Sequence, residues 1–236
     1  MFTLATHTII FIFLSSLLAG CGKTTSPYNS DQYPLEAREE QEGYFRAQLK
    51  PVNSKINSRV SGRVSVFLRG NQFYAKVRAS SGYKSVTHIQ GIHVGTRCPT
   101  IHDDVNRDGV VDGAETLQVV GRMLVPLDGD LSRQLRNFHL WPTTNRKGEY
   151  LYARSTAVED IMGELRTRSP RPHELVTRLG TDQEFQLAQR VIVIYGVPYD
   201  TRLPGGIKSI SGFPPYMLIP IACGNLYETG ETYPFD

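Results

Sequence analysis

Residues 60–79 read Val-Ser-Gly-Arg-Val-Ser-Val-Phe-Leu-Arg-Gly-Asn-Gln-Phe-Tyr-Ala-Lys-Val-Arg-Ala, and this stretch decides the fold class. Apolar or small residues occupy every second position of 60–68 and again of 73–79. A period of two is typical of strands that bury one face. Gly70-Asn71 lies between the two runs and favours a tight hairpin. The stretch therefore predicts two antiparallel strands.

Further strands are expected on both sides of this hairpin. The apolar run Val191–Tyr195 is almost wholly β-branched, as expected of a buried strand. Four other segments are strand candidates, namely 86–94, 117–127, 149–153 and 217–223. Helical signals are short: capping boxes at 156–159 and 181–184, and a run over 172–179 that ends at a glycine. Residues 203–215 read as one long loop. Short strands with little helix predict an all-β sandwich with long loops and a few short helices, as one domain over 44–236.

Composition excludes several classes of protein. The 236 residues include 40% hydrophobic and 21% charged side chains, which are ordinary values for a globular protein. A net charge of +3 on this length is too small to indicate a nucleic-acid-binding protein. Three cysteines are too few for a dense disulfide scaffold or a cysteine-rich zinc module.

The N-terminus predicts export. Residues 9–18 are largely apolar, too short a run for a bilayer core that takes about 20 helical residues, but suited to a signal peptide. Leu18-Ala19-Gly20-Cys21 resembles a bacterial lipobox, although no Lys or Arg precedes the run. The resemblance implies a signal peptide over 1–20, lipidation and membrane anchoring at Cys21, and a location in the bacterial cell envelope facing the periplasm or the exterior. An ordinary secretory signal is the alternative. Residues 21–43, which are mostly polar, are interpreted as a flexible tether.

Residues 104–115 match an EF-hand calcium loop at every position. They read Asp-Val-Asn-Arg-Asp-Gly-Val-Val-Asp-Gly-Ala-Glu, with glycine at position 6, where the chain turns sharply. Calcium takes six to eight hard oxygen ligands, and a 12-residue loop supplies them without distant partners. The predicted ligands are Asp104, Asn106, Asp108, Val110 through its carbonyl, Asp112 and Glu115. No entering helix and no second loop are evident, so we expect an isolated calcium loop inserted in another fold. A polar Asp/Gly turn without metal is the alternative.

Three segments together resemble one family. Gly91-Ile92-His93-Val94 follows the hairpin and precedes Cys98, 191–196 is a late buried strand, and Ala222-Cys223-Gly224 lies near the C-terminus. This order resembles the Cu/Zn superoxide dismutase sandwich and its non-enzymatic relative, the CHRD domain. The resemblance implies a Greek-key sandwich and a Cys98–Cys223 disulfide, which would contribute about 4–5 kcal/mol in the chain-entropy model.

The copper site of that family does not carry over. His93 matches the first ligand, but Gly95 stands where a second histidine is expected, and the late strand offers Tyr195. His88 lies five residues before His93, and an odd separation places two side chains on opposite faces of a regular strand. His102 and His139 lie in the region that holds the family's metal ligands, but neither has the matching spacing.

The sequence therefore favours a lipid-anchored, exported, calcium-binding β-sandwich with a structural or binding role and no catalysis. A divergent copper-binding, superoxide dismutase-like protein is the alternative. A surface adhesion module, in which calcium orders a binding loop, is a third hypothesis, and the sequence names no protein or glycan partner for it.

Overall fold

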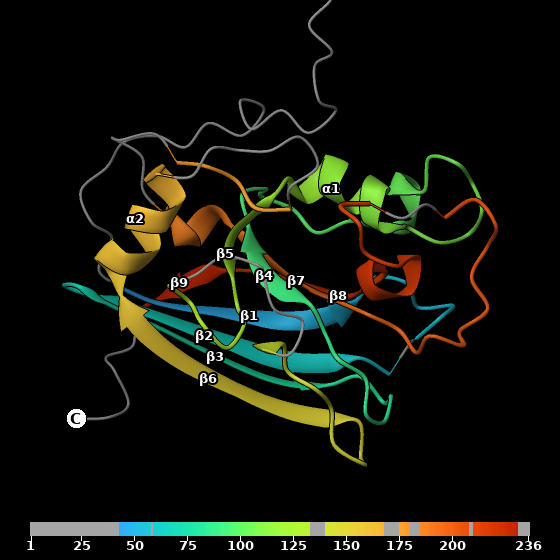
Figure 1. Cartoon of the computed structure of the whole chain (residues 1–236), viewed down its shortest axis with the longest axis horizontal. Helices are drawn as coiled ribbons and strands as arrows, with labels where there is room; N and C mark the ends of the chain where they lie inside the picture. The colour runs from blue at the N-terminus through green and yellow to red at the C-terminus, as the bar shows by residue number, and fades with distance from the viewer. Residues whose placement is uncertain are drawn as a thin grey trace, which may run out of the picture.

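The computed structural model describes residues 43–57, 59–132, 140–167, 175–179, 185–207 and 210–230. These residues are mostly β: nine antiparallel strands form one sheet that curls into a half-barrel, with two short helices (Figure 1). The strands are β1 (Gly43–Pro51), β2 (Ser61–Arg69), β3 (Gln72–Ser80), β4 (Gln90–His93), β5 (Met123–Pro126), β6 (Glu149–Ala157), β7 (Val191–Tyr195), β8 (Pro220–Asn225) and β9 (Tyr227–Thr229). The helices are α1 (Gly113–Val120) and α2 (Val158–Thr167), and short 3₁₀ turns cover Ile101–Asp103, Leu187–Gln189 and Pro215–Leu218.

The predicted hairpin forms as expected and sits at the centre of one half of the sheet. Arg69 pairs with Gln72, which leaves Gly70 and Asn71 as a two-residue turn. Gly70 has a φ of 53°, a conformation that glycine adopts at no steric cost. Val64 and Val66 of β2 and Val77 of β3 are buried, while Arg63 and Arg78 on the opposite face are exposed. The period of two therefore marks the buried face correctly.

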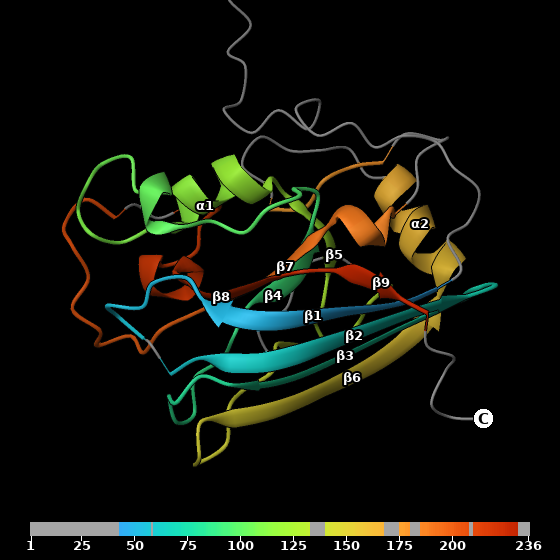
Figure 2. The ribbon, with the colours of Figure 1, turned by 180° about the vertical axis from the view of Figure 1, so that it is seen from behind.

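The sheet runs in the order β5-β4-β7-β8-β1-β2-β3-β6. Within the described residues its two halves meet where Lys50 and Pro51 of β1 pair with Cys223 and Ala222 of β8. At its other end β1 instead pairs with β9. Because the halves separate away from this join, β1, β2, β3 and β6 form a lower layer below β4, β5, β7 and β8 (Figures 1 and 2).

The core lies between these two layers. The lower layer contributes side chains such as Phe45 and Phe73, and the upper layer contributes Ile92, Val193 and Ile221, all at most 1% exposed. Burial of apolar surface on this scale is the main stabilising contribution to a fold of this size. Helices α1 and α2 lie over the upper layer, away from the outer face of β1, β2, β3 and β6 (Figures 1 and 2).

Some expected elements were wrong. Residues 117–127 were expected as one strand, but the first four residues end α1 and only Met123–Pro126 form β5. The candidate over 86–94 reduces to β4, and the candidate over 217–223 begins as a 3₁₀ turn before β8. Strands β1 and β9 were not expected. The predicted capping box at 156–159 lies at the start of α2 but does not form, because Thr156 is still in β6 and the Glu159 N–H donates to Asn71 Oδ1. The predicted box at 181–184 lies outside the described residues.

Candidate metal centre

The predicted calcium loop connects a short 3₁₀ turn to a regular helix. Asp104 follows the turn Ile101–Asp103 directly, and Asp112 is the N-cap residue of α1. The Asp112 carboxylate accepts a hydrogen bond from the Glu115 backbone N–H at 2.9 Å, and Glu115 Oε2 accepts one from the Asp112 N–H at 3.0 Å. This reciprocal capping box satisfies two backbone donors that a helix start otherwise leaves unpaired. The last two charged positions of the loop therefore also fix the start of a helix.

The first half of the loop is wrapped around its own polar side chains. The Asp104 carboxylate accepts hydrogen bonds from the N–H groups of Asp108 at 3.2 Å and Gly109 at 2.8 Å. Asn106 Oδ1 accepts one from the Asp108 N–H at 2.8 Å. Arg107 and Gly109 have φ values of 60° and 90°, which let the chain reverse within a few residues. The side chains at positions 1 and 3 are thus directed toward the interior of the loop.

Glu115 closes the loop from its other end. Its Oε1 accepts hydrogen bonds from the N–H groups of Val105 at 2.8 Å and Asn106 at 3.1 Å, across about ten residues of chain. Glu115 is only 6% exposed, and Asp112 only 4%. Both carboxylates accept backbone N–H groups, which compensates for their burial.

The described residues contain no group of three His, Cys, Asp or Glu side chains gathered closely enough to hold a metal ion. The loop carboxylates point at backbone N–H groups instead of converging on one point. Their chemistry fits calcium, because every side-chain donor proposed is a hard carboxylate or amide oxygen. Binding would require Glu115 to exchange N–H partners for the ion.

Asn53 and Gly206 hold the loop against the rest of the fold. Asn53, which is buried between β1 and β2, donates from Nδ2 to the carbonyls of Val111 and Pro220, each at 2.9 Å. Its Oδ1 accepts from the Val111 N–H at 2.9 Å. Gly206, in the connection between β7 and β8, packs so closely that a Cβ there would lie 3.1 Å from Asp108 Oδ2. Neither Asn53 nor Gly206 stands out in the sequence, because their roles depend on contacts between residues far apart in the chain.

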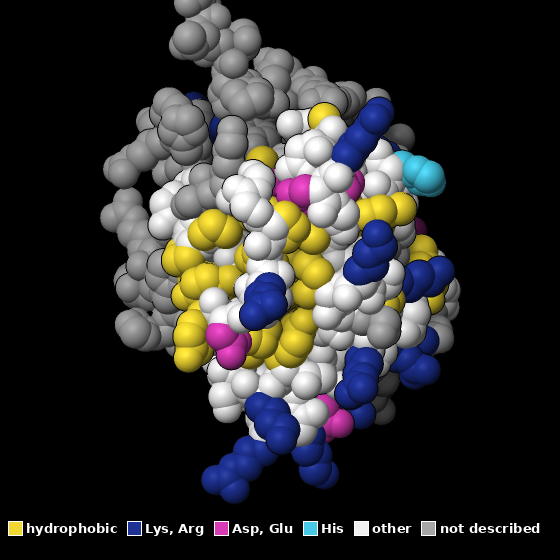
Figure 3. Space-filling model, turned by 90° about the vertical axis from the view of Figure 1, so that its right-hand side faces the viewer, with side chains coloured by type: hydrophobic (Ala, Val, Ile, Leu, Met, Phe, Trp, Pro, Cys, Tyr) yellow, Lys and Arg dark blue, Asp and Glu magenta, His cyan; other side chains and the backbone are white. Residues whose placement is uncertain are grey.

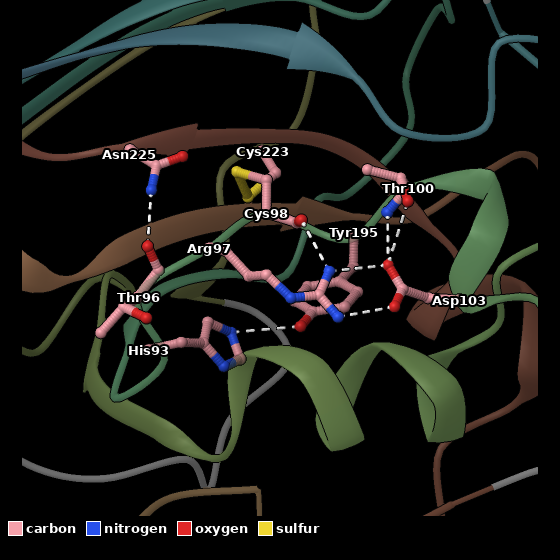
Figure 4. Close-up of a disulfide and its surroundings, with 9 residues drawn as sticks. All are labelled: His93, Thr96, Arg97, Cys98, Thr100, Asp103, Tyr195, Cys223 and Asn225. Carbon is pink, nitrogen blue, oxygen red and sulfur yellow. Dashed lines mark hydrogen bonds and ion pairs between the residues drawn. A yellow bond between two sulfur atoms is a disulfide. The ribbon is translucent and has the colours of Figure 1, made fainter. Parts of the chain in front are cut away.

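The loop is also tied to β8 by a disulfide. Cys98 and Cys223 are bonded, with their Cα atoms 5.7 Å apart, so the pairing implied by the family resemblance is present (Figure 4). Next to it, Arg97 makes two hydrogen bonds to the Asp103 carboxylate, at 2.9 and 2.7 Å. This Arg97 contact, aided by the Thr100 N–H, lowers the pKa of Asp103 to about 2. Asp103 is therefore engaged by Arg97, and Asp104 is the first loop position.

The two histidines considered for copper are buried in hydrogen-bond networks. His93 Nδ1 lies 2.9 Å from the Gly121 carbonyl, and its Nε2 lies 3.1 Å from the Tyr195 hydroxyl (Figure 4). Since a carbonyl only accepts, Nδ1 carries the proton and Nε2 accepts from the tyrosine. His88 is held in the same way between the Tyr195 carbonyl and the Ser81 hydroxyl, each at 3.0 Å. Burial lowers the pKa of both rings to about 4, so both are neutral near pH 7.

The other two histidines are not part of this network. His102 is exposed on the 3₁₀ turn before the loop, and His139 lies outside the described residues. The structure thus brings His93 and Tyr195 together but uses both nitrogens of His88 and of His93 in protein hydrogen bonds. These contacts give no support to a copper site.

The end of the molecule that carries the connection between β7 and β8 exposes apolar side chains among charged ones (Figure 3). Tyr199 in this connection is 81% exposed.

No protein-family model and no curated protein matches the chain. Cys21, the segment 1–20 and residues 22–42 of the predicted tether 21–43 lie outside the described residues, and Gly43 begins β1. Within the described part, none of the helices has the length and apolar character needed to cross a bilayer.

Proposed function

We propose that this chain is an exported, lipid-anchored calcium-binding protein with a structural or binding role in the cell envelope and no catalysis. The proposed calcium ligands are five side chains and one backbone carbonyl of the loop. The side chains are those of Asp104, Asn106, Asp108, Asp112 and Glu115, at positions 1, 3, 5, 9 and 12, and the carbonyl is that of Val110, at position 7.

The observation that carries this proposal is the wrapping of residues 104–115 around their own carboxylates. Asp104 accepts two backbone N–H groups from the turn, and Glu115 reaches back across the loop to its second and third residues. This arrangement brings carboxylates from both ends of the loop to its backbone N–H groups, from which calcium would draw their oxygens. A divalent cation bound to the loop would offset repulsion among its four carboxylates.

The fold adds support for the family that the sequence resembles. The chain passes from β3 in the lower layer to β4 in the upper layer, and then returns to the lower layer, where β6 pairs with β3. It crosses again to the upper layer, where β7 pairs with β4. Such connections are of the Greek-key kind. The Cys98–Cys223 disulfide links the segment after β4 to β8, as the resemblance implies. We therefore propose a superoxide dismutase-like or CHRD-like Greek-key sandwich with the calcium loop as an insertion. The lipid anchor at Cys21 rests on the sequence alone.

Isothermal titration of the purified protein with calcium tests the site. We expect one calcium per chain, and a rise in stability of about 2.7 kcal/mol when free calcium exceeds the dissociation constant 100-fold. Asp104→Ala removes a ligand and should abolish both effects. Asp103→Asn is the matched control, because it removes a neighbouring acid that pairs with Arg97 and should leave calcium binding intact. No uptake at millimolar calcium, with equal melting points for both variants, would refute the proposal.

Copper binding is tested in the same preparations. Metal analysis after purification with copper should show no stoichiometric copper, because the His88 and His93 rings are held by protein partners. Stoichiometric copper that is lost in His93→Ala would favour the copper-binding alternative.

A further inference from the structure

The outer face of the lower layer carries a row of basic side chains on β1, β2 and β3. Arg63 of β2 is directly opposite Arg78 of β3 in the antiparallel register. Two residues further along, Lys76 is opposite Ser65, which in turn is opposite Arg46 of β1. Because side chains in one row or on the diagonal lie about 5–8 Å apart, these four cations form one continuous patch.

Like charges directly opposite each other destabilise a sheet. Among the residues that the structure describes, no carboxylate makes an ion pair with Arg63, Lys76 or Arg78. The nearest acid in the rows is Glu149, which lies diagonal to Arg78. A fold that keeps two arginines facing each other across two strands gains nothing in stability from them, so a role in binding accounts for them better.

Three of the four cations line a groove. A depression of about 890 Å³ runs over β2, β3 and the start of β6, and its walls include Arg63, Lys76 and Arg78. Tyr44 and Tyr74 border it. The remaining lining includes one carboxylate, Glu149, a few apolar residues, and a set of hydroxyl and amide groups, namely Gln48, Ser61, Ser65, Ser80 and Asn145. Groups of this kind donate to and accept from sugar hydroxyls, and tyrosine rings offer flat apolar faces.

We infer that this groove binds an acidic polysaccharide, with Arg63, Arg78 and Lys76 holding its carboxylate, sulfate or phosphate groups. A guanidinium binds such groups in a bidentate manner, and two facing guanidiniums can hold one anion between them. A recessed cationic surface fits a thin, flexible chain better than a planar bilayer, whose headgroups do not enter a groove. The hydroxyl and amide lining favours a sugar polymer over a purely electrostatic contact.

The groove and the calcium loop lie on opposite sides of the molecule, because α1 covers the upper layer and the groove lies on the outside of the lower one (Figures 1 and 2). The inference therefore does not rest on calcium binding. Measurements in EDTA keep the two apart, since loss of calcium uptake leaves the groove unchanged.

The test measures binding of the purified full chain to immobilised heparin, with neutral dextran as the blank. We expect binding to heparin that weakens as salt rises, and none to dextran. Arg63→Gln with Arg78→Gln removes two charge-assisted contacts and should weaken binding about tenfold to hundredfold. The thermal midpoint of this variant should stay equal or rise, because a repulsive pair is removed.

Lys55→Gln with Arg202→Gln is the matched control, since it removes the same charge from exposed positions away from the groove. Unchanged heparin affinity in this control supports the groove, and an equal loss in both double variants overturns it, because the attraction is then diffuse. A third arm compares vesicles of phosphatidylglycerol with vesicles of phosphatidylcholine. If the Arg63/Arg78 variant loses affinity for anionic vesicles but not for heparin, the face is a membrane contact and the inference is wrong.

Discussion

Mild acid should destabilise this protein through its two buried histidines. Burial lowers the pKa of His88 and His93 from 6.5 to about 4, and both rings are fully buried with both nitrogens in hydrogen bonds. In the unfolded chain the rings return to the ordinary value. Between about pH 6.5 and pH 4 the unfolded state therefore binds more protons than the folded state, and stability falls as the pH falls.

The magnitude follows from the two pKa values. A change from 6.5 to about 4 corresponds to about 3 kcal/mol for each ring over the whole window. One group opposes this effect: burial, together with the charge of Asp130, raises the pKa of Asp128 from 3.8 to about 6. Its protonation stabilises the folded state as the pH falls through 6, by nearly 3 kcal/mol in all. The net loss is thus about 3–4 kcal/mol, a large part of a typical stability of about 5–15 kcal/mol.

Urea unfolding at a series of pH values between about 4.5 and 7 measures this loss. Trp141 is the single tryptophan and is buried, so its fluorescence reports unfolding. Near pH 5 unfolding should take up about one proton in the wild type, which gives a slope of about 1.3 kcal/mol per pH unit. Asp128→Asn removes the opposing group and should double the slope. His93→Gln keeps a donor for the Gly121 carbonyl and an acceptor for the Tyr195 hydroxyl but cannot titrate, so its slope should fall near zero.

EDTA in every sample excludes a contribution from calcium, whose binding also depends on pH. A flat stability profile in the wild type below pH 6 would show that the rings are not buried as described. The same conclusion holds if His93→Gln leaves the slope unchanged, because the titration then belongs to other groups.

Three other perturbations test the loop and its anchors. Cys98→Ala with Cys223→Ala should lower the free energy of unfolding by about 4–5 kcal/mol in urea titrations, and a loss below about 1 kcal/mol would contradict a native disulfide closing this long loop. Asn53→Ala leaves the Val111 and Pro220 carbonyls without their donor and should cost about 2–3 kcal/mol in thermal unfolding, whereas an unchanged midpoint would show that the clamp is not formed. Asp112→Ala removes the N-cap of α1 and should cost about 1 kcal/mol in EDTA but more in saturating calcium; an equal cost in both would exclude Asp112 as a ligand.

The hairpin strands β2 and β3 and the buried strand β7 were predicted from the pattern of apolar residues within each strand. Residues 60–68 and 73–79 each alternate, and β7 is wholly apolar, so no distant contact is needed to recognise these strands. Strand β1 carries the same alternation, with Phe45, Ala47 and Leu49 buried, but over fewer residues and beside a polar segment. Helix α1 was missed because Val119 and Val120 favour a strand by propensity alone, while the capping box outweighs them.

The candidate site shows the same division between local and distant information. The ligand positions of the predicted calcium loop could be assigned from the sequence, because the spacing of residues along the chain defines them. The chain wraps around Asp104 in the way that this spacing predicts. The Asn53 clamp joins residues 58 and 167 positions apart, and the contact between His93 and Tyr195 spans 102 positions. A pattern over a short window contains no information about such pairs. They become visible only when β1, β4, β7 and β8 are placed side by side.

The anchoring of the loop decides what calcium can do for the whole protein. The disulfide fixes the chain six positions before Asp104, Asn53 holds Val111 against the start of β8, and α1 begins at Asp112. A loop fixed at both ends cannot open alone, because its release would break the contacts of β8, which pairs with both β7 and β1. In the described sheet, the pairing of β8 with β1 connects the half made of β4, β5, β7 and β8 to the half made of β1, β2, β3 and β6. A ligand that stabilises the loop would therefore stabilise this pairing as well. The binding free energy of calcium would therefore add to global stability and not merely to the order of one surface segment.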